Sequence, residues 1–126
     1  GFETDLIFNF KNAANLKLGY AFLEDDTYIN NISFSKYSLN SLKHNFISKI
    51  SFKYSKKLSQ NFVFRYAERS DKTNYRIFDS NIIYKPFNEG GEFFLNLNNI
   101  FDEYYWETNL VQMPGQNLIL GYRLSI

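Results

Sequence analysis

Apolar and polar residues alternate along most of this 126-residue chain. Between 116 and 126, Leu118, Leu120 and Tyr122 fall on one face, and Asn117 and Arg123 fall on the other. Because side chains alternate across a β-strand, this pattern predicts a strand with one apolar face. The alternation recurs in six earlier segments, so the predicted strands are 1–10, 16–23, 45–54, 62–69, 78–85, 93–98 and 116–126.

The composition agrees with strands: 20% of the residues are aromatic, and no segment is a run of strong helix formers. We therefore predict an all-β fold, an antiparallel up-and-down meander of about seven strands. Its connections alternate in length as short, long, short, medium, short and long. In a meander this places tight turns at one end and long loops at the other, which is typical of outer-membrane barrels.

The two predicted faces differ in charge. Phe, Leu, Ile and Tyr gather on one face, and we expect every charged strand residue to lie on the other, because a lipid-facing Arg or Lys costs about 2–4 kcal/mol at the midplane. A wet lumen tolerates such residues. The residues predicted to face the lumen are Lys49, Arg65, Asp79, Asn81, Asn96, Asn98 and Arg123.

Other features narrow the functional classes. The net charge of +1 gives no basis for nucleic-acid binding, and the chain has no cysteine and a single histidine, His44. No catalytic constellation and no metal or cofactor motif stands out, so we expect neither an enzyme nor a cofactor. The sequence contains no run of about 18 apolar residues, so it predicts no membrane-spanning helix. The chain starts inside an alternating pattern at Gly1, which we interpret as a fragment of a larger barrel.

Two pieces of the chain resemble a known family. The segment Asn99-Ile100-Phe101-Asp102, followed by Tyr104 and Tyr105, resembles the penultimate strand and loop start of TonB-dependent outer-membrane receptors. The segment from Pro114-Gly115 to Gly121-Tyr122-Arg123 is similar to the terminal strand of that family. Weaker likenesses lie at 38–44 and 78–80. Two positions depart from the family pattern: Gln116 stands where Arg is usual, and Ile126 stands where the last residue is usually Phe.

The resemblance implies that residues 1–126 are the C-terminal part of a 22-stranded transmembrane β-barrel whose N-terminal plug domain is absent from this sequence. It also implies a place in the bacterial outer membrane and uptake of a scarce ligand with energy supplied through TonB. Such a ligand is siderophore-bound iron, haem, cobalamin or a glycan. The implied partners are membrane lipid, the rest of the barrel and plug, TonB, and the small-molecule ligand.

Ligand contact is best placed on the long connections, because aromatic side chains supply rigid contact area and Arg pairs with carboxylates. Interfacial anchoring or loop packing is the competing interpretation of the same residues. The ligand-binding candidates are Tyr28, Tyr37, Arg69, Tyr75, Arg76, Tyr104, Tyr105 and Trp106.

Two other functions fit the same pattern of strands. A soluble up-and-down β-barrel would bind a small apolar ligand inside, with the apolar face turned inward. A passive outer-membrane porin would share the strand pattern and lack a plug.

Overall fold

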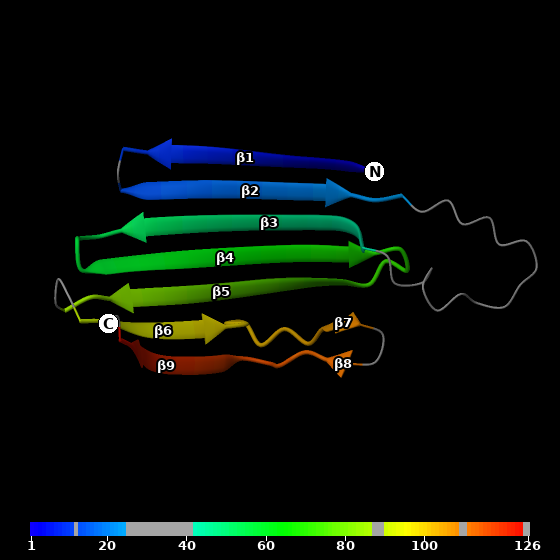
Figure 1. Cartoon of the computed structure of the whole chain (residues 1–126). Coiled ribbons are helices and arrows are strands. Elements are labelled where there is room, and N and C mark those ends of the chain that lie inside the picture. Colours follow the sequence, from blue (N-terminus) through cyan, green and yellow to red (C-terminus); the bar gives the residue numbers. More distant parts are fainter. Residues whose placement is uncertain (12, 25–41, 87–89, 109–110, 125–126) are drawn as a thin grey trace, which may run out of the picture.

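The computed structural model describes residues 1–11, 13–24, 42–86, 90–108 and 111–124. Within these ranges the chain forms strands and connections without a helix, and seven strands lie side by side in one antiparallel layer (Figure 1). Their order, β1-β2-β3-β4-β5-β6-β9, is the predicted meander, and β7 and β8 form a separate hairpin. The strands are β1 Phe2–Phe10, β2 Ala14–Phe22, β3 Leu42–Lys53, β4 Leu58–Arg69, β5 Asn74–Tyr84, β6 Glu92–Asn98, β7 Trp106–Thr108, β8 Val111–Gln112 and β9 Asn117–Arg123.

Several strands extend beyond the predicted bounds. Strand β4 begins at Leu58, which pairs with Tyr84, although Ser and Asn in 55–61 indicated a turn. Strand β5 begins at Asn74, opposite Glu68, four residues before the predicted start. The backbone of each strand therefore stays paired with its long neighbour even at polar residues, which by themselves favour turns.

The register aligns one apolar face across the whole sheet. Residues that pair across neighbouring strands, such as Leu6 on β1 and Leu18 on β2, lie on the same side of the sheet. Because side chains alternate along each strand, one apolar pair in register brings the other apolar residues of the two strands onto that side as well. The resulting apolar face comprises Phe2, Leu6, Phe8, Phe10, Leu16, Leu18, Tyr20, Phe22, Phe46, Ile50, Phe52, Phe62, Phe64, Tyr66, Phe78, Ile82, Tyr84, Phe93, Leu95, Leu97, Leu118, Leu120 and Tyr122. The opposite side is called the polar face.

The expectation that every charge lies on the polar face was wrong at one end of the sheet. Glu68 and Arg76 belong to the apolar face. Glu68 lies within the predicted strand 62–69 and shares the face of Phe64 and Tyr66 by alternation alone. Arg76 joins the sheet because β5 begins before the predicted start, which pairs Arg76 with Tyr66. The Tyr66 hydroxyl donates to Glu68 Oε2 at 2.6 Å, and the Arg76 guanidinium lies 5.9 Å from the Tyr66 ring centroid. These two charged side chains therefore lie at the end of the apolar face, where Tyr66 contacts both of them.

The predicted segregation of connection lengths holds only in part. The connections β1–β2, β3–β4 and β5–β6 meet at one end, called the turn end (at the left of Figure 1). The other end, called the loop end, carries the β2–β3 and β6–β9 connections, and also the tight turn 70–73. That turn is closed by the Lys72 N–H donating to the Arg69 carbonyl at 2.9 Å, with Lys72 at a φ of 67°. The medium-length connection predicted at 70–77 is thus a four-residue turn.

Buried side chains are few and lie mainly beneath the β6–β9 connection. Ile77 is completely buried on the polar face, together with Ala67 and Tyr105. Much of the apolar face is exposed, including Leu118 and Leu120. A helix of sufficient length and apolarity to cross a membrane is absent from the described part of the chain.

Candidate functional site

The polar face carries a row of amides that crosses the sheet in register. Asn61 donates through Nδ2 to Asn81 Oδ1 at 3.1 Å, and Asn81 donates in turn to Asn96 Oδ1. Asn9, Asn15 and Ser51 continue the same row through β1, β2 and β3. Each amide can donate and accept, so the row satisfies part of its own hydrogen-bonding capacity and presents the remainder to whatever faces it.

Asn99 anchors the beginning of the β6–β9 connection. It has a φ of 49°, which Asn tolerates better than most residues, and it is buried. Its backbone N–H donates to Asp79 Oδ1 at 2.8 Å, while its side chain accepts from the Glu103 N–H and donates to the Glu103 carbonyl, each at 2.8 Å. The next N–H, of Ile100, donates to the Phe78 carbonyl at 2.8 Å. The connection is therefore fixed to β5 as it leaves β6.

The end of the same connection is fixed to its beginning. The Gln116 N–H donates to Asp102 Oδ1 at 2.7 Å, and Gln116 Nε2 donates to the Ile100 carbonyl at 2.8 Å. Asp102 has a φ of 55°, and its carboxylate lies where a Cβ on Gly115 would be. The two sequence pieces that carried the resemblance, 99–102 and 114–121, thus meet in one hydrogen-bonded unit.

The middle of the connection folds over the polar face of β4 and β5. The Tyr105 ring packs on the Tyr75 ring with centroids 4.7 Å apart, and Tyr105 is buried. Arg69 donates through Nη2 to the carbonyls of Trp106 and Glu107, the first at 3.1 Å. A strand arginine thereby holds the connection against the sheet.

A cavity of about 310 Å³ remains under this cover. Its charged members are Arg65 and Asp79, whose Nη2 and Oδ2 atoms are 3.1 Å apart, and Arg65 also approaches Glu107 at 3.7 Å. Arg65 Nε is buried without a hydrogen-bond partner in the described residues. Burial raises the pKa of the Tyr105 phenol, which is therefore a neutral donor at physiological pH. The cavity lining is Arg65, Ile77, Asp79, Asn98, Asn99, Tyr105, Pro114 and Asn117.

The structure brings only some of the predicted ligand-binding residues together. Arg69, Tyr75 and Tyr105 contact one another or the same connection, beside the cavity. Tyr104 and Trp106 pack edge to face at 5.0 Å on the exposed side of that connection. Arg76 lies on the apolar face, away from this group. Tyr28 and Tyr37 lie outside the described residues.

All seven residues predicted to face the lumen share the polar face. Arg65, Asp79 and Asn98 line the cavity, and Asn81 and Asn96 belong to the amide row. Arg123 donates to Glu92 Oε1 at 2.7 Å near the turn end, and Lys49 stands in register with Lys17. That these residues face a lumen stays a prediction.

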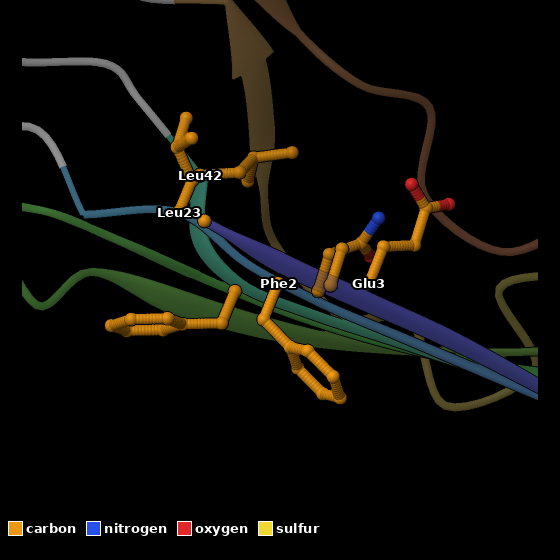
Figure 2. A pocket seen from close by; sticks show the side chains of 8 residues that line it. Phe2, Glu3, Leu23 and Leu42 are labelled. Carbon is orange, nitrogen blue, oxygen red and sulfur yellow. The ribbon is translucent and has the colours of Figure 1, made fainter.

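A second hollow, of about 510 Å³, lies at the loop end beside the edge strand β1 (Figure 2). Leu23 and Leu42 lie close to one another there, and Phe2 and Glu3 point to opposite sides of β1. The Leu23 N–H donates to the Lys43 carbonyl at 3.0 Å. The hollow therefore lies where the chain leaves β2 and where it enters β3.

Sequence reasoning missed Asn99 and Asn117 as members of the site. Asn99 belongs to the motif that resembles the receptor family, but the sequence did not show that its backbone N–H donates to Asp79. No group of three or more His, Asp or Glu suitable for a metal ion occurs in the ranges that the structure describes.

No family model, curated protein or solved structure matches this chain. The resemblance to TonB-dependent receptors therefore stays a prediction that depends on the motif residues. Those residues have a structural role here, because Asn99, Asp102 and Gln116 close the base of the β6–β9 connection.

Proposed function

We propose that this chain is a wall segment of a transmembrane β-barrel in the bacterial outer membrane, from a receptor of the TonB-dependent kind that takes up a scarce ligand. The observation that carries the proposal is the continuous apolar face, which crosses all seven strands of the sheet. The β6–β9 connection folds over the polar face instead, where it meets Tyr75.

The exposure of the apolar face supports contact with lipid. Leu120 is 71% exposed, Leu118 62% and Phe2 59%. Burying a Leu or Phe side chain is worth about 1.5–3 kcal/mol, so water contact along the whole face would be strongly unfavourable. Hydrocarbon removes this cost without a second protein layer.

The aromatic rows on this face have a suitable spacing. Tyr20, Phe46 and Tyr66 are in register near the loop end, and Tyr84, Phe93 and Tyr122 are in register near the turn end. Eight residues of β5 separate the level of Tyr66 from that of Tyr84. This is about 27 Å along the strand, or about 20 Å along the membrane normal at the usual tilt, close to the height of an apolar band in such barrels.

The sheet edges support a barrel larger than seven strands. In the described part of the chain, β1 pairs only with β2, and β9 pairs only with β6. Unpaired backbone groups are untenable in lipid, so further strands are required at both edges. The 22-stranded barrel and its plug belong to this proposal. The open sheet also favours a membrane wall over a small soluble barrel, since it encloses no apolar interior.

The polar face supplies groups suited to a ligand pathway. The cavity is lined by the Arg65 guanidinium group and the neutral Tyr105 phenol, both near the loop end. Arg69 and Tyr75 position the cover of this cavity. We assign the cavity to transient ligand contact during uptake. A passive porin would share this face, and dependence of uptake on TonB separates the two functions.

Trypsin treatment of intact cells tests the topology. We expect cleavage within residues 24–43, which contain Lys36, and protection of the turn-end pair Lys56 and Lys57. In permeabilised cells both places should be cut. The variant Lys36→Gln, Lys43→Gln is the matched control, because it removes both lysines of residues 24–43 and leaves the turn-end pair Lys56 and Lys57. Equal cleavage at both ends in intact cells, or recovery of the protein free of the membrane fraction, would contradict the proposal.

A further inference from the structure

A hollow at the turn end of the sheet lies on the polar face. It has a volume of about 500 Å³, between the β3–β4 turn and the end of β5. Its strand residues Lys53 and Ser59 pair with each other, and both alternate with residues of the apolar face. The full lining is Lys53, Ser55, Lys56, Lys57, Leu58, Ser59 and Lys85. Four ammonium groups and two hydroxyls therefore surround a space that is turned away from the apolar face.

The positive charge of the hollow is only partly neutralised within the described part of the chain. Lys85 pairs with Glu92 at 3.3 Å, but Glu92 also pairs with Arg123 at 2.7 Å. Lys57 Nζ donates at 2.9 Å to a backbone carbonyl of the β5–β6 connection, which is a neutral partner. Glu89, in the same connection, lies outside the described ranges. Like charges held close together cost free energy, so an anion in the hollow would lower that cost.

The excess of positive charge continues from the hollow along the polar face. Lys49 precedes Lys53 on β3 and stands directly opposite Lys17 on β2, and the side chains of Lys49 and Lys17 are exposed. Like charges at directly opposite positions destabilise an antiparallel pair. Neither of these two lysines forms an ion pair with any of the described residues. Such a field attracts small anions toward the hollow and repels cations.

Hydrogen bonds order the backbone around the hollow. Ser55 Oγ accepts from the N–H groups of Lys57 and Leu58, each at 3.1 Å, so its hydroxyl proton can be donated to a ligand. The Lys85 N–H donates to the Lys57 carbonyl at 2.7 Å, which joins the turn to β5. The positions from which the lysine side chains extend are therefore fixed before a ligand arrives, which reduces the ordering cost of binding.

The size of the hollow and the placement of its ammonium groups indicate the ligand class. A volume of about 500 Å³ is suited to a small molecule. Ammonium groups on the turn and at the ends of β3 and β5 can each meet a separate anionic group of one ligand, and linked contacts bind more tightly than single ones. We infer that the hollow of Lys53, Lys56, Lys57 and Lys85 binds a small polyanion that carries several carboxylate or phosphate groups. This inference is independent of the proposed function, because it involves the polar face alone.

Isothermal titration calorimetry of the protein, purified from its own cells in mild detergent, tests this inference. Citrate and pyrophosphate are the probes, and acetate and glucose are the controls with one negative charge and with none. We expect both polyanions to bind more tightly than acetate, glucose not to bind, and the affinity for polyanions to fall as salt is added. The tighter of the two probes identifies carboxylate or phosphate as the preferred group. Absence of binding of both polyanions at low salt, or affinities no higher than that of acetate, would overturn the inference.

Substitution of the lysines locates the binding site. The triple variant Lys53→Gln, Lys56→Gln, Lys57→Gln should raise the Kd of the polyanion by about 10- to 100-fold, since an exposed charge pair contributes up to about fivefold. The corresponding Lys→Arg triple variant keeps the charges and should bind as the wild type does. Because all three side chains are exposed, both variants should keep the wild-type unfolding temperature without probe. A Kd unchanged by the Gln substitutions would show that the polyanion does not occupy this hollow.

A control with the same change in charge separates the site from the net charge of the protein. The triple variant Lys36→Gln, Lys43→Gln, Lys72→Gln removes three positive charges outside the hollow. It should bind citrate and pyrophosphate as the wild type does. An equal loss of affinity in the two Gln variants would overturn the inference, because binding would then follow net charge alone.

Discussion

The Tyr105 ring lies on the Tyr75 ring, with centroids 4.7 Å apart and the ring planes inclined by 40°. Tyr75 belongs to the polar face of β5, and Tyr105 belongs to the connection that leaves β6. The contact buries Tyr105 and closes the connection over Ile77, the most buried residue of the described chain. Two residues predicted to touch ligand thus also hold the wall of the cavity.

Tyr105→Ala should release this cover. Removal of a large buried aromatic side chain typically costs about 3–5 kcal/mol, and we expect a loss of similar order in the free energy of unfolding. Limited proteolysis between 103 and 116 should accelerate, because the connection loses its contact with β5. Tyr105→Phe is the control, since it keeps the stacked ring. A proteolysis rate unchanged in Tyr105→Ala would show that the stacking does not hold the connection.

Asn99→Ala should destabilise the base of the connection by about 2–4 kcal/mol. It removes two side-chain hydrogen bonds to Glu103 and strains a residue whose φ is 49°. Asn99→Gly separates the two effects, because glycine accepts this φ and lacks the amide. Denaturant unfolding should rank wild type above Asn99→Gly and Asn99→Gly above Asn99→Ala. Equal stability of the two variants would assign the whole loss to the hydrogen bonds.

Gly121→Val should distort the terminal strand. Phe94 stands opposite Gly121 and covers it, so its ring occupies the space that a Cβ there would need. Forcing extra atoms into such a contact costs about 1–3 kcal/mol, and displacement of Phe94 would also disturb Arg123, which lies over that ring at 5.7 Å. Ile119→Val, on the same strand and face, is the matched control. Thermal unfolding should show a lower midpoint for Gly121→Val alone.

Asp71 should titrate below its ordinary pKa of 3.8, because its carboxylate accepts hydrogen bonds from the Thr73 hydroxyl at 2.6 Å and the Thr73 N–H at 2.9 Å. A folded-state pKa that is lowered contributes stability above pH 3.8, and this contribution is lost as the pH falls through the folded pKa. The effect is small, since the group is exposed. NMR titration should show the pKa returning toward 3.8 in Thr73→Ala. An unchanged value would exclude the hydroxyl as its cause.

The seven-stranded sheet was predictable in strand number, order and face, whereas the β7–β8 hairpin was not predicted. Alternation placed Phe62 and Phe64 on one side and Arg65 on the other, and both placements agree with the register. Strand ends were less predictable: Leu58 and Asn74 are paired in the sheet, although the polar residues near them favour turns. Long pairing partners decided these ends, and the misplaced Arg76 followed from the same error. Glu68 falls on the apolar face by alternation within the predicted strand itself.

The sequence alone determined an antiparallel meander with one apolar face, because period-two alternation is a local property that each strand carries by itself. Only the tertiary structure decided which residues of the connections contact one another and the sheet. Asn99 and Asp102 reach across to 114–116, and Tyr105 reaches back to Tyr75, through contacts between residues far apart in the chain. Such contacts depend on register and on the path of a long connection, neither of which alternation specifies.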